Sequence, residues 1–239
     1  TATSLTGPLG SPRRYRCAAV DLADVSVMRD GLGGSINDAV LAIVSRAFRT
    51  LLAARGEEPA PHAVRCLVPV SVRTTADGPE AANRVSAVLI ELPVDFTDAG
   101  SAYGATSARM RRLKSSHEVD AGEAVVALAR YLPPAVALEV LRAAASVPSR
   151  TLTTVVTNVP GPRRQARLLG RPLAALYPYV PIADRIRIAV AVTSYGDRLY
   201  FGVTCDRDSV GDADVFVAGL CGGVAELVKA ATIVRDARP

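Results

Sequence analysis

The pattern of apolar positions predicts one long amphipathic helix near the start of the chain. Between Ser35 and Arg55 apolar residues recur every three or four positions, which places them on one face of a helix. Ser35 or Asn37 can cap the N-terminus, and Asp38 lies in the first turn, where a negative charge is favourable. Gly56 is a typical residue at a helix end.

Runs of β-branched and other apolar residues predict strands elsewhere. The expected strands are Tyr15–Leu22, Val64–Arg73, Arg84–Val94, Thr153–Thr157, Arg185–Thr193 and Leu199–Cys205. Gly196 and Asp197 separate the last two strands and form a plausible hairpin turn, so part of the sheet should be antiparallel.

Further helices are expected at Ser101–Ser115, at Glu123–Val147 and at Ala213–Ala231, the second of them divided by Pro133 and Pro134. Strands and helices in this mixed order indicate an α/β (α+β) fold, in which a mixed, partly antiparallel sheet is packed with helices.

The segment Thr153–Pro162, with the sequence TTVVTNVPGP, predicts a strand that ends in a rigid corner. Pro160 cannot donate a hydrogen bond to a neighbouring strand, so the strand should end there. Pro160 and Pro162 fix their own φ, while Gly161 permits a positive φ. The corner should hold the amide of Asn158 at a repeatable position.

Residues 1–14 consist of turn-forming residues with little to bury, which indicates a linker that enters from an earlier part of a longer protein. Residues 15–239 are then expected to form one domain. A chain of this length can bury a sizeable core.

The net charge of +5 comes almost wholly from arginine. Arginine suits a phosphorylated ligand or an acidic membrane face, although a host's codon usage explains the same bias. The four cysteines lack metal-ligand or redox spacing, which indicates buried, reduced thiols. No signal peptide is evident, and the apolar stretch Ala124–Val147 is interrupted by charges and prolines, so a cytoplasmic location is expected.

Self-contained catalytic chemistry is missing from the sequence. The two histidines, His62 and His117, lie in polar segments that are typical of a solvated surface. Serine elbows, phosphate-binding glycine loops, zinc spacings and dinucleotide motifs are absent. The sequence therefore predicts no metal and no bound cofactor, and the active site should be incomplete.

Four motifs together resemble a known family. They are SINDAVLA at 35–42, PVSVR at 69–73 followed by NRVS at 83–86, TNVPGP at 157–162, and SYG at 194–196 leading to FGV at 201–203 and Asp206. Their order and spacing are similar to those in the C-terminal half of the bacterial wax ester synthase/diacylglycerol acyltransferase (WS/DGAT) family, and SLTGPLGSPRR at 4–14 resembles its mid-chain linker.

The resemblance implies a chloramphenicol acetyltransferase-like half of a CoA-dependent acyltransferase, with a tunnel between two similar halves. In that family the catalytic histidine belongs to an HHxxxDG motif of the N-terminal half, which this sequence lacks. The implied function is transfer of a fatty acyl group from acyl-CoA to diacylglycerol or a long-chain alcohol. The isolated chain should be inactive and should supply positioning and electrostatics.

The resemblance also implies roles for particular residues. Asn37 and Asp38 match a pair suspected near the active site, although both also suit a helix cap. Thr157 or Asn158 could donate to the oxyanion of the transition state or could stabilise the turn. Structural or tunnel roles are expected for Ser71, Arg73, Asn83, Pro160, Gly161, Pro162, Ser194, Tyr195 and Asp206.

Arg163, Arg164, Arg167 and Arg171 follow the corner and could hold CoA phosphates or meet anionic lipid, or simply be solvated. The expected partners are the N-terminal half, acyl-CoA, the acceptor and a membrane or lipid-inclusion surface; nucleic acid is not expected. Two alternatives are a non-catalytic lipid- or CoA-binding domain and half of a peptide-synthetase condensation domain.

Overall fold

The computed structural model describes residues 3–71, 85–115, 152–162, 164–183 and 185–237. Its centre is a six-stranded mixed sheet in the order β1-β8-β7-β4-β2-β3. The strands are β1 (Arg13–Asp21), β2 (Arg65–Ser71), β3 (Val85–Glu91), β4 (Thr154–Val159), β7 (Ile188–Tyr195) and β8 (Arg198–Asp206). Strands β2, β4 and β7 are parallel neighbours, and the remaining pairs are antiparallel. The predicted α/β fold with a mixed, partly antiparallel sheet is confirmed.

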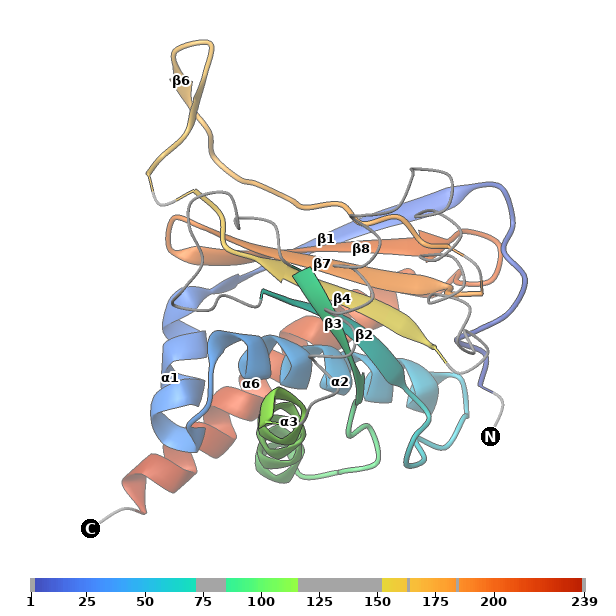
Figure 1. The fold of residues 1–239 in the computed structure, drawn as a ribbon, viewed down its shortest axis with the longest axis horizontal. Helices are drawn as coiled ribbons and strands as arrows, with labels where there is room; N and C mark the ends of the chain where they lie inside the picture. The colour runs from blue at the N-terminus through green and yellow to red at the C-terminus, as the bar shows by residue number, and fades with distance from the viewer. Residues whose placement is uncertain (1–2, 72–84, 116–151, 163, 184, 238–239) are drawn as a thin grey trace, which may run out of the picture.

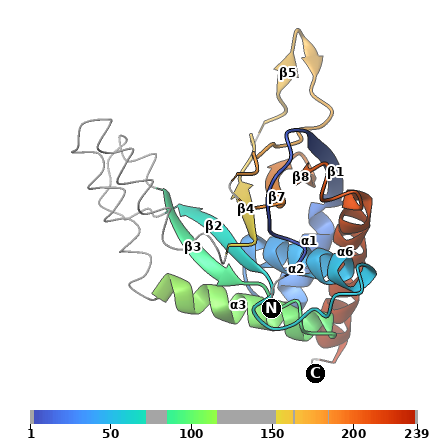
Figure 2. The same cartoon turned by 90° about the vertical axis from the view of Figure 1, so that its right-hand side faces the viewer.

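The described helices cover one face of the sheet (Figures 1 and 2). They are α1 (Leu22–Leu32), α2 (Ile36–Ala54), α3 (Ala99–Ser115) and α6 (Ala213–Asp236). The predicted helix at Glu123–Val147 lies outside the described residues. The expected strands and the other helices are present with shifts of a few residues at their ends.

Helix α2 is the centre of the core, because its residues from Ala39 to Phe48 are almost all inaccessible to solvent. A capping box begins it: the Ser35 hydroxyl accepts from the Asp38 amide, and the Asp38 carboxylate accepts from the Ser35 amide at 2.8 Å. Gly56, with φ of 71°, follows its last turn as expected.

Helix α6 packs directly against α2. A Cβ at Gly219 would lie 2.9 Å from the Ala47 backbone, and one at Gly223 would lie 2.7 Å from the Arg46 side chain. Phe216 of α6 contacts Phe48 edge-on with ring centroids 4.8 Å apart. By length and composition α6 is long and apolar enough to cross a membrane. In this structure its glycines approach α2 closely and its buried apolar residues pack in the core.

Three features were not expected. Helix α1 was not predicted, because its sequence lacks a strong apolar period. The expected strand Tyr15–Leu22 ends at Asp21, and α1 begins at the next residue.

The residues 167–172 form a small hairpin, β5 (Arg167–Leu168) and β6 (Arg171–Pro172). The expectation that residues 1–14 bury little is wrong, because Leu5 is fully buried and Thr6 pairs with Ile186. Whether this segment also links to another domain stays a prediction.

The thiol prediction is half right. All four cysteines are free, but only Cys66 and Cys205 are buried, whereas Cys17 and Cys221 are exposed. Burial raises the pKa of the Cys205 thiol to about 12 and raises that of Cys66 as well. Both buried thiols therefore stay protonated and inert.

Residues 173–183, called the strap here, cross the sheet on the face opposite the helices. The hydroxyl of Tyr15 donates to the Pro178 carbonyl at 2.9 Å, and a Cβ at Gly202 of β8 would lie 1.7 Å from the same oxygen. The strap can lie this close to the sheet only because position 202 has no side chain.

Gly202→Ala should lower the free energy of unfolding by about 1–3 kcal/mol, because the strap must move away from β8. Gly222→Ala is the control: position 222 faces open space on α6, where alanine favours the helix. Urea unfolding of both variants measures the difference, and equal effects would show that the strap does not constrain position 202.

Candidate functional site

The sheet brings the motif-bearing strand ends to one edge. Because β2, β4 and β7 run parallel, their carboxyl ends meet at the same edge, where open α/β sheets commonly bind ligands. Ser71 is the last residue of β2. Asn158 and Ser194 are the second-to-last residues of β4 and β7. Arg73 and Asn83 lie outside the described residues.

The N-terminus of α2 points to the same end of the molecule (Figure 1). Asp38 is 7% exposed, and its second carboxylate oxygen has no hydrogen-bond partner among the described residues. The Tyr103 hydroxyl of α3 donates to the Gly33 carbonyl at 2.6 Å and fixes the turn before α2. Burial, aided by the Asp38 charge, raises the pKa of Tyr103 to about 12. The helix-cap role of Asp38 is therefore visible; an active-site role for Asn37 and Asp38 stays a prediction.

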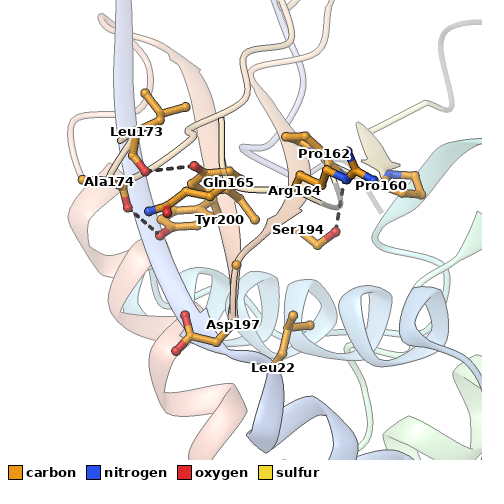
Figure 3. A pocket seen from close by; sticks show the side chains of 13 residues that line it. Leu22, Pro160, Pro162, Arg164, Gln165, Leu173, Ala174, Ser194, Asp197 and Tyr200 are labelled. Atoms are coloured by element: carbon orange, nitrogen blue, oxygen red, sulfur yellow. Dashed lines mark hydrogen bonds between the residues drawn. The ribbon is translucent and has the colours of Figure 1, made fainter. Parts of the chain in front are cut away.

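Two side chains of β7 hold the Pro160–Pro162 corner. The Thr193 hydroxyl donates to the Val159 carbonyl at 2.8 Å, and the Ser194 hydroxyl accepts from the Gly161 amide at 3.3 Å (Figure 3). The TNVPGP and SYG motifs are therefore halves of one contact. Thr193 was not singled out from the sequence, because its partner is 34 residues away.

Gly161 is needed for a different reason than expected. Its φ is not among the positive values of the described glycines. Instead, a Cβ at this position would lie 1.8 Å from the Ser194 carbonyl oxygen. The glycine provides space for two backbones to approach, and the positive φ that a glycine permits is not used here.

Tyr195 ties the chain that follows the corner back to the sheet. Its hydroxyl accepts from the Ala166 amide at 3.1 Å and donates to the Leu173 carbonyl at 2.9 Å. These two residues flank the β5–β6 hairpin, so Tyr195 fixes the base of that hairpin.

A cavity of about 470 Å³ opens between the corner, the β7–β8 turn and the start of the strap (Figure 3). Its walls combine the apolar Leu22 and Leu173 with the polar Arg164, Ser194 and Asp197. The complete lining is Leu22, Pro160, Gly161, Pro162, Arg164, Gln165, Leu173, Ala174, Ser194, Tyr195, Gly196, Asp197 and Tyr200. The strap residues and Tyr200 were missed from sequence, since only the folded chain brings them to the corner.

Thr157 and Asn158 face opposite sides of the sheet, because successive side chains of a strand alternate. Val156 packs into the core beneath the helices, which places Asn158 on the helix-covered face. Val155 packs in the cluster on the other face, and Thr157 follows it there. The two candidates therefore cannot serve the same oxyanion, and only Asn158 shares a face with α2.

Among the residues that the structure describes, no histidine lies at this edge of the sheet. His62 precedes β2 at the opposite end of that strand and contacts the Glu91 carboxylate at 2.5 Å. His117 lies outside the described residues. The described edge therefore offers hydroxyl, amide and carboxylate groups but no imidazole for proton transfer.

The four arginines after the corner do not form one cluster. Arg164 lines the cavity, whereas Arg167 and Arg171 belong to the projecting β5–β6 hairpin. Arg163 lies outside the described residues. A second cavity of about 470 Å³ lies between β3 and α3 and is lined in part by Arg65 and Arg109.

Asp206 lies away from the corner and fastens the N-terminal segment. It is 1% exposed and accepts hydrogen bonds from the amides of Gly10 at 2.9 Å and Ser209 at 3.0 Å. Burial alone would raise the pKa of this carboxyl, but the bonds from Ser209 and Gly10 and the Arg13 charge outweigh burial and lower it.

The fold is that of one half of a chloramphenicol acetyltransferase-like protein. Residues 81–227 match the WS/DGAT C-terminal domain family, and the chain belongs to that family. Recognition of the family from its four motifs is thus confirmed.

Relatives agree with this assignment. "Probable diacylglycerol O-acyltransferase tgs1" of Mycobacterium tuberculosis is 39% identical over 95% of this chain. A wax ester synthase/diacylglycerol acyltransferase from Marinobacter aquaeolei VT8 has the same fold, with a TM-score of 0.75 and 24% identity over 97% of this chain. The epimerization domain of tyrocidine synthetase B is more distant, with a TM-score of 0.54 and 12% identity over 91% of this chain and 49% of that one. The chain spans about half of the first two proteins, 49% and 52% of their lengths.

Asp206→Asn should lower the free energy of unfolding at neutral pH by about 1–3 kcal/mol, because the buried side chain loses the charge that strengthens its bonds from the Gly10 and Ser209 amides. The lowered carboxyl pKa adds stability above the unfolded-state pKa of about 4, and this stability is lost as the pH falls through the folded-state pKa. The difference between wild type and variant should therefore shrink below about pH 4. Urea unfolding across pH measures it, with the exposed Asp208→Asn as control; a difference that does not change with pH would contradict the assignment.

Proposed function

We propose that this chain is the C-terminal half of an O-acyltransferase that moves a fatty acyl group from acyl-CoA to diacylglycerol or a long-chain alcohol. The observation that carries the proposal is the meeting of the family's motifs at the carboxyl edge of β2, β4 and β7, beside the cavity. The names of the mycobacterial and Marinobacter relatives support the two acceptors.

In the proposed reaction the catalytic groups come from both the N-terminal and the C-terminal half of the protein. A histidine of the HHxxxDG motif on the N-terminal half takes the proton of the acceptor hydroxyl, and the oxygen attacks the thioester carbonyl. The tetrahedral oxyanion collapses to the new ester, the C–S bond breaks, and the CoA thiolate receives the proton from the histidine. Acyl-CoA is a substrate in this scheme, and the chain needs no resident cofactor.

This half contributes orientation and a polar environment. The rigid corner held by Thr193 and Ser194 positions the end of β4, and with it Asn158. The amide of Asn158 lies on the face that α2 covers, and the N-terminus of α2 directs its positive dipole to the same end. Both features would stabilise negative charge that develops on the carbonyl oxygen.

The proposed location is the cytoplasm, at the surface of a membrane or a lipid inclusion, because both acceptors partition into lipid. The peptide-synthetase alternative has less support, since the epimerization domain shares the fold alone at 12% identity. The non-catalytic lipid- or CoA-binding domain remains as an outcome of the experiment below.

Asn158→Ala should lower kcat of the assembled enzyme about 10²–10³-fold, the usual effect of removing one oxyanion donor. Thr157→Val is the matched control, because Thr157 neighbours Asn158 on the same strand but faces the other side of the sheet. Steady-state kinetics with acyl-CoA and diacylglycerol separate kcat from KM. Equal losses in both variants would contradict the oxyanion role of Asn158.

Activity itself is tested by co-expressing this chain with the N-terminal half of the mycobacterial tgs1 relative. The chain alone should release no CoA from acyl-CoA, whereas the co-purified pair should form triacylglycerol and free CoA in equal amounts. Robust turnover by the isolated chain would contradict the assignment of the catalytic histidine to the N-terminal half. A pair that co-purifies and binds acyl-CoA without turnover would favour the non-catalytic alternative.

A further inference from the structure

The β5–β6 hairpin projects from the body of the molecule, and the strap that follows it lies on the same side (Figures 1 and 2). The whole stretch from Pro162 to Ala183 contains four arginines and no aspartate or glutamate. In the described part of this stretch, Arg164, Arg167 and Arg171 are all exposed. The projecting surface is therefore purely cationic.

The tip of the hairpin is apolar. Leu168 is 67% exposed and Leu169 is 97% exposed, the largest exposed fraction among the large apolar residues that the structure describes. Leu168 faces Arg171 across the hairpin, so Leu169 and Gly170 form a two-residue turn. Two leucines thus stand in solvent beside two arginines.

Leu169 also occupies a backbone conformation that disfavours it. Its φ is 50° and that of Gly170 is 78°, the pair of positive values found in hairpin turns that usually carry Asn-Gly. A leucine here is less favourable for the fold than asparagine, and its side chain makes no compensating burial. Such a residue is explained by what it meets outside the chain.

Two exposed tyrosines lie on the strap that follows the hairpin. Tyr179 is 62% exposed and Tyr177 is 43% exposed. Each ring also contacts a tyrosine of the sheet: Tyr177 meets Tyr200 edge-on with centroids 5.0 Å apart, and Tyr179 meets Tyr15 at a tilt with centroids 6.0 Å apart. Tyrosines with one apolar and one wet side are typical of residues at a lipid–water interface.

We propose that the β5–β6 hairpin and the strap dock on an anionic lipid surface, with Leu168 and Leu169 inserted among the acyl chains and Arg167 and Arg171 at the headgroups. This inference rests on the proposed function, in which the acceptor is held in lipid. The hairpin base is fixed by Tyr195 beside the cavity, so docking would bring the cavity to the lipid surface.

Lipid is favoured over a protein partner on two grounds. The stretch has a single sign of charge, which matches the uniformly negative surface of an anionic bilayer. A specific protein interface buries about 800 Å² of surface on each partner, whereas the apolar surface at the tip consists of two leucines. Leucine insertion combined with headgroup contacts from arginine needs no such area.

Leu169→Asn isolates the apolar contribution. Asparagine suits the positive φ, so the variant should be at least as stable as the wild type in thermal unfolding. Its affinity for vesicles of phosphatidylcholine with phosphatidylglycerol should fall about tenfold, from the loss of one inserted leucine. Ile233→Asn is the matched control, because Ile233 of α6 is 60% exposed and should not touch lipid.

Arg167→Gln with Arg171→Gln isolates the charge contribution. The pair should weaken binding to the anionic vesicles by about fivefold for each arginine and should remove most of its salt dependence. Arg111→Gln with Arg207→Gln removes the same charge from other exposed positions and should have a small effect.

Co-sedimentation of the 239-residue chain with anionic and with pure phosphatidylcholine vesicles measures all of these affinities. The proposal is supported by binding to anionic vesicles that the two hairpin variants lose and the two controls keep. It is overturned if wild type does not bind, if all variants bind alike, or if Leu169→Asn disrupts co-purification with the N-terminal half and leaves vesicle binding intact. None of these results bears on the acyl-transfer experiment. Failure of the lipid-docking proposal can therefore be told apart from failure of the acyl-transfer proposal.

Discussion

The contact between the corner at Gly161 and the end of β7 at Ser194 is the constraint on which the candidate site depends. Parallel pairing brings β4 and β7 side by side, but pairing alone leaves the chain beyond Val159 without a fixed direction. The direction comes from the two β7 hydroxyls that bond the corner and from a glycine that lets the backbones meet. The chain leaves the corner in the direction that this contact sets, and Tyr195 then holds Ala166 and Leu173 against the end of β7.

In the proposed reaction the same contact lets this chain contribute orientation while the base comes from the N-terminal half. Orientation and preorganised dipoles require rigid backbone, and the prolines, the β7 hydroxyls and the capped α2 supply it. The histidine that the proposed reaction needs for proton transfer is not among the described residues of this edge. The family to which the chain belongs, and its span of about half of its relatives, agree with a division of these tasks between two halves.

The sequence predicted the features that depend on local patterns. Helix α2 with its cap, the end of β4 at Pro160 and the Gly196–Asp197 hairpin each follow from a few neighbouring residues. The cavity could not be predicted, because its walls come from the corner, the β7–β8 turn and the strap, and only tertiary contacts bring them together. Gly161 shows the difference: a glycine was correctly singled out, but close approach of Ser194, which no local rule reveals, is the reason for it.

The central claim is that the carboxyl edge of β2, β4 and β7 is the part of this chain that meets the substrate. Hydrogen exchange of the assembled two-half protein, with and without a non-hydrolysable acyl-CoA analogue, tests it most directly. We expect residues 158–165 and 194–197 to be protected when the analogue binds. Protection confined to the second cavity between β3 and α3, with the corner unchanged, would contradict it.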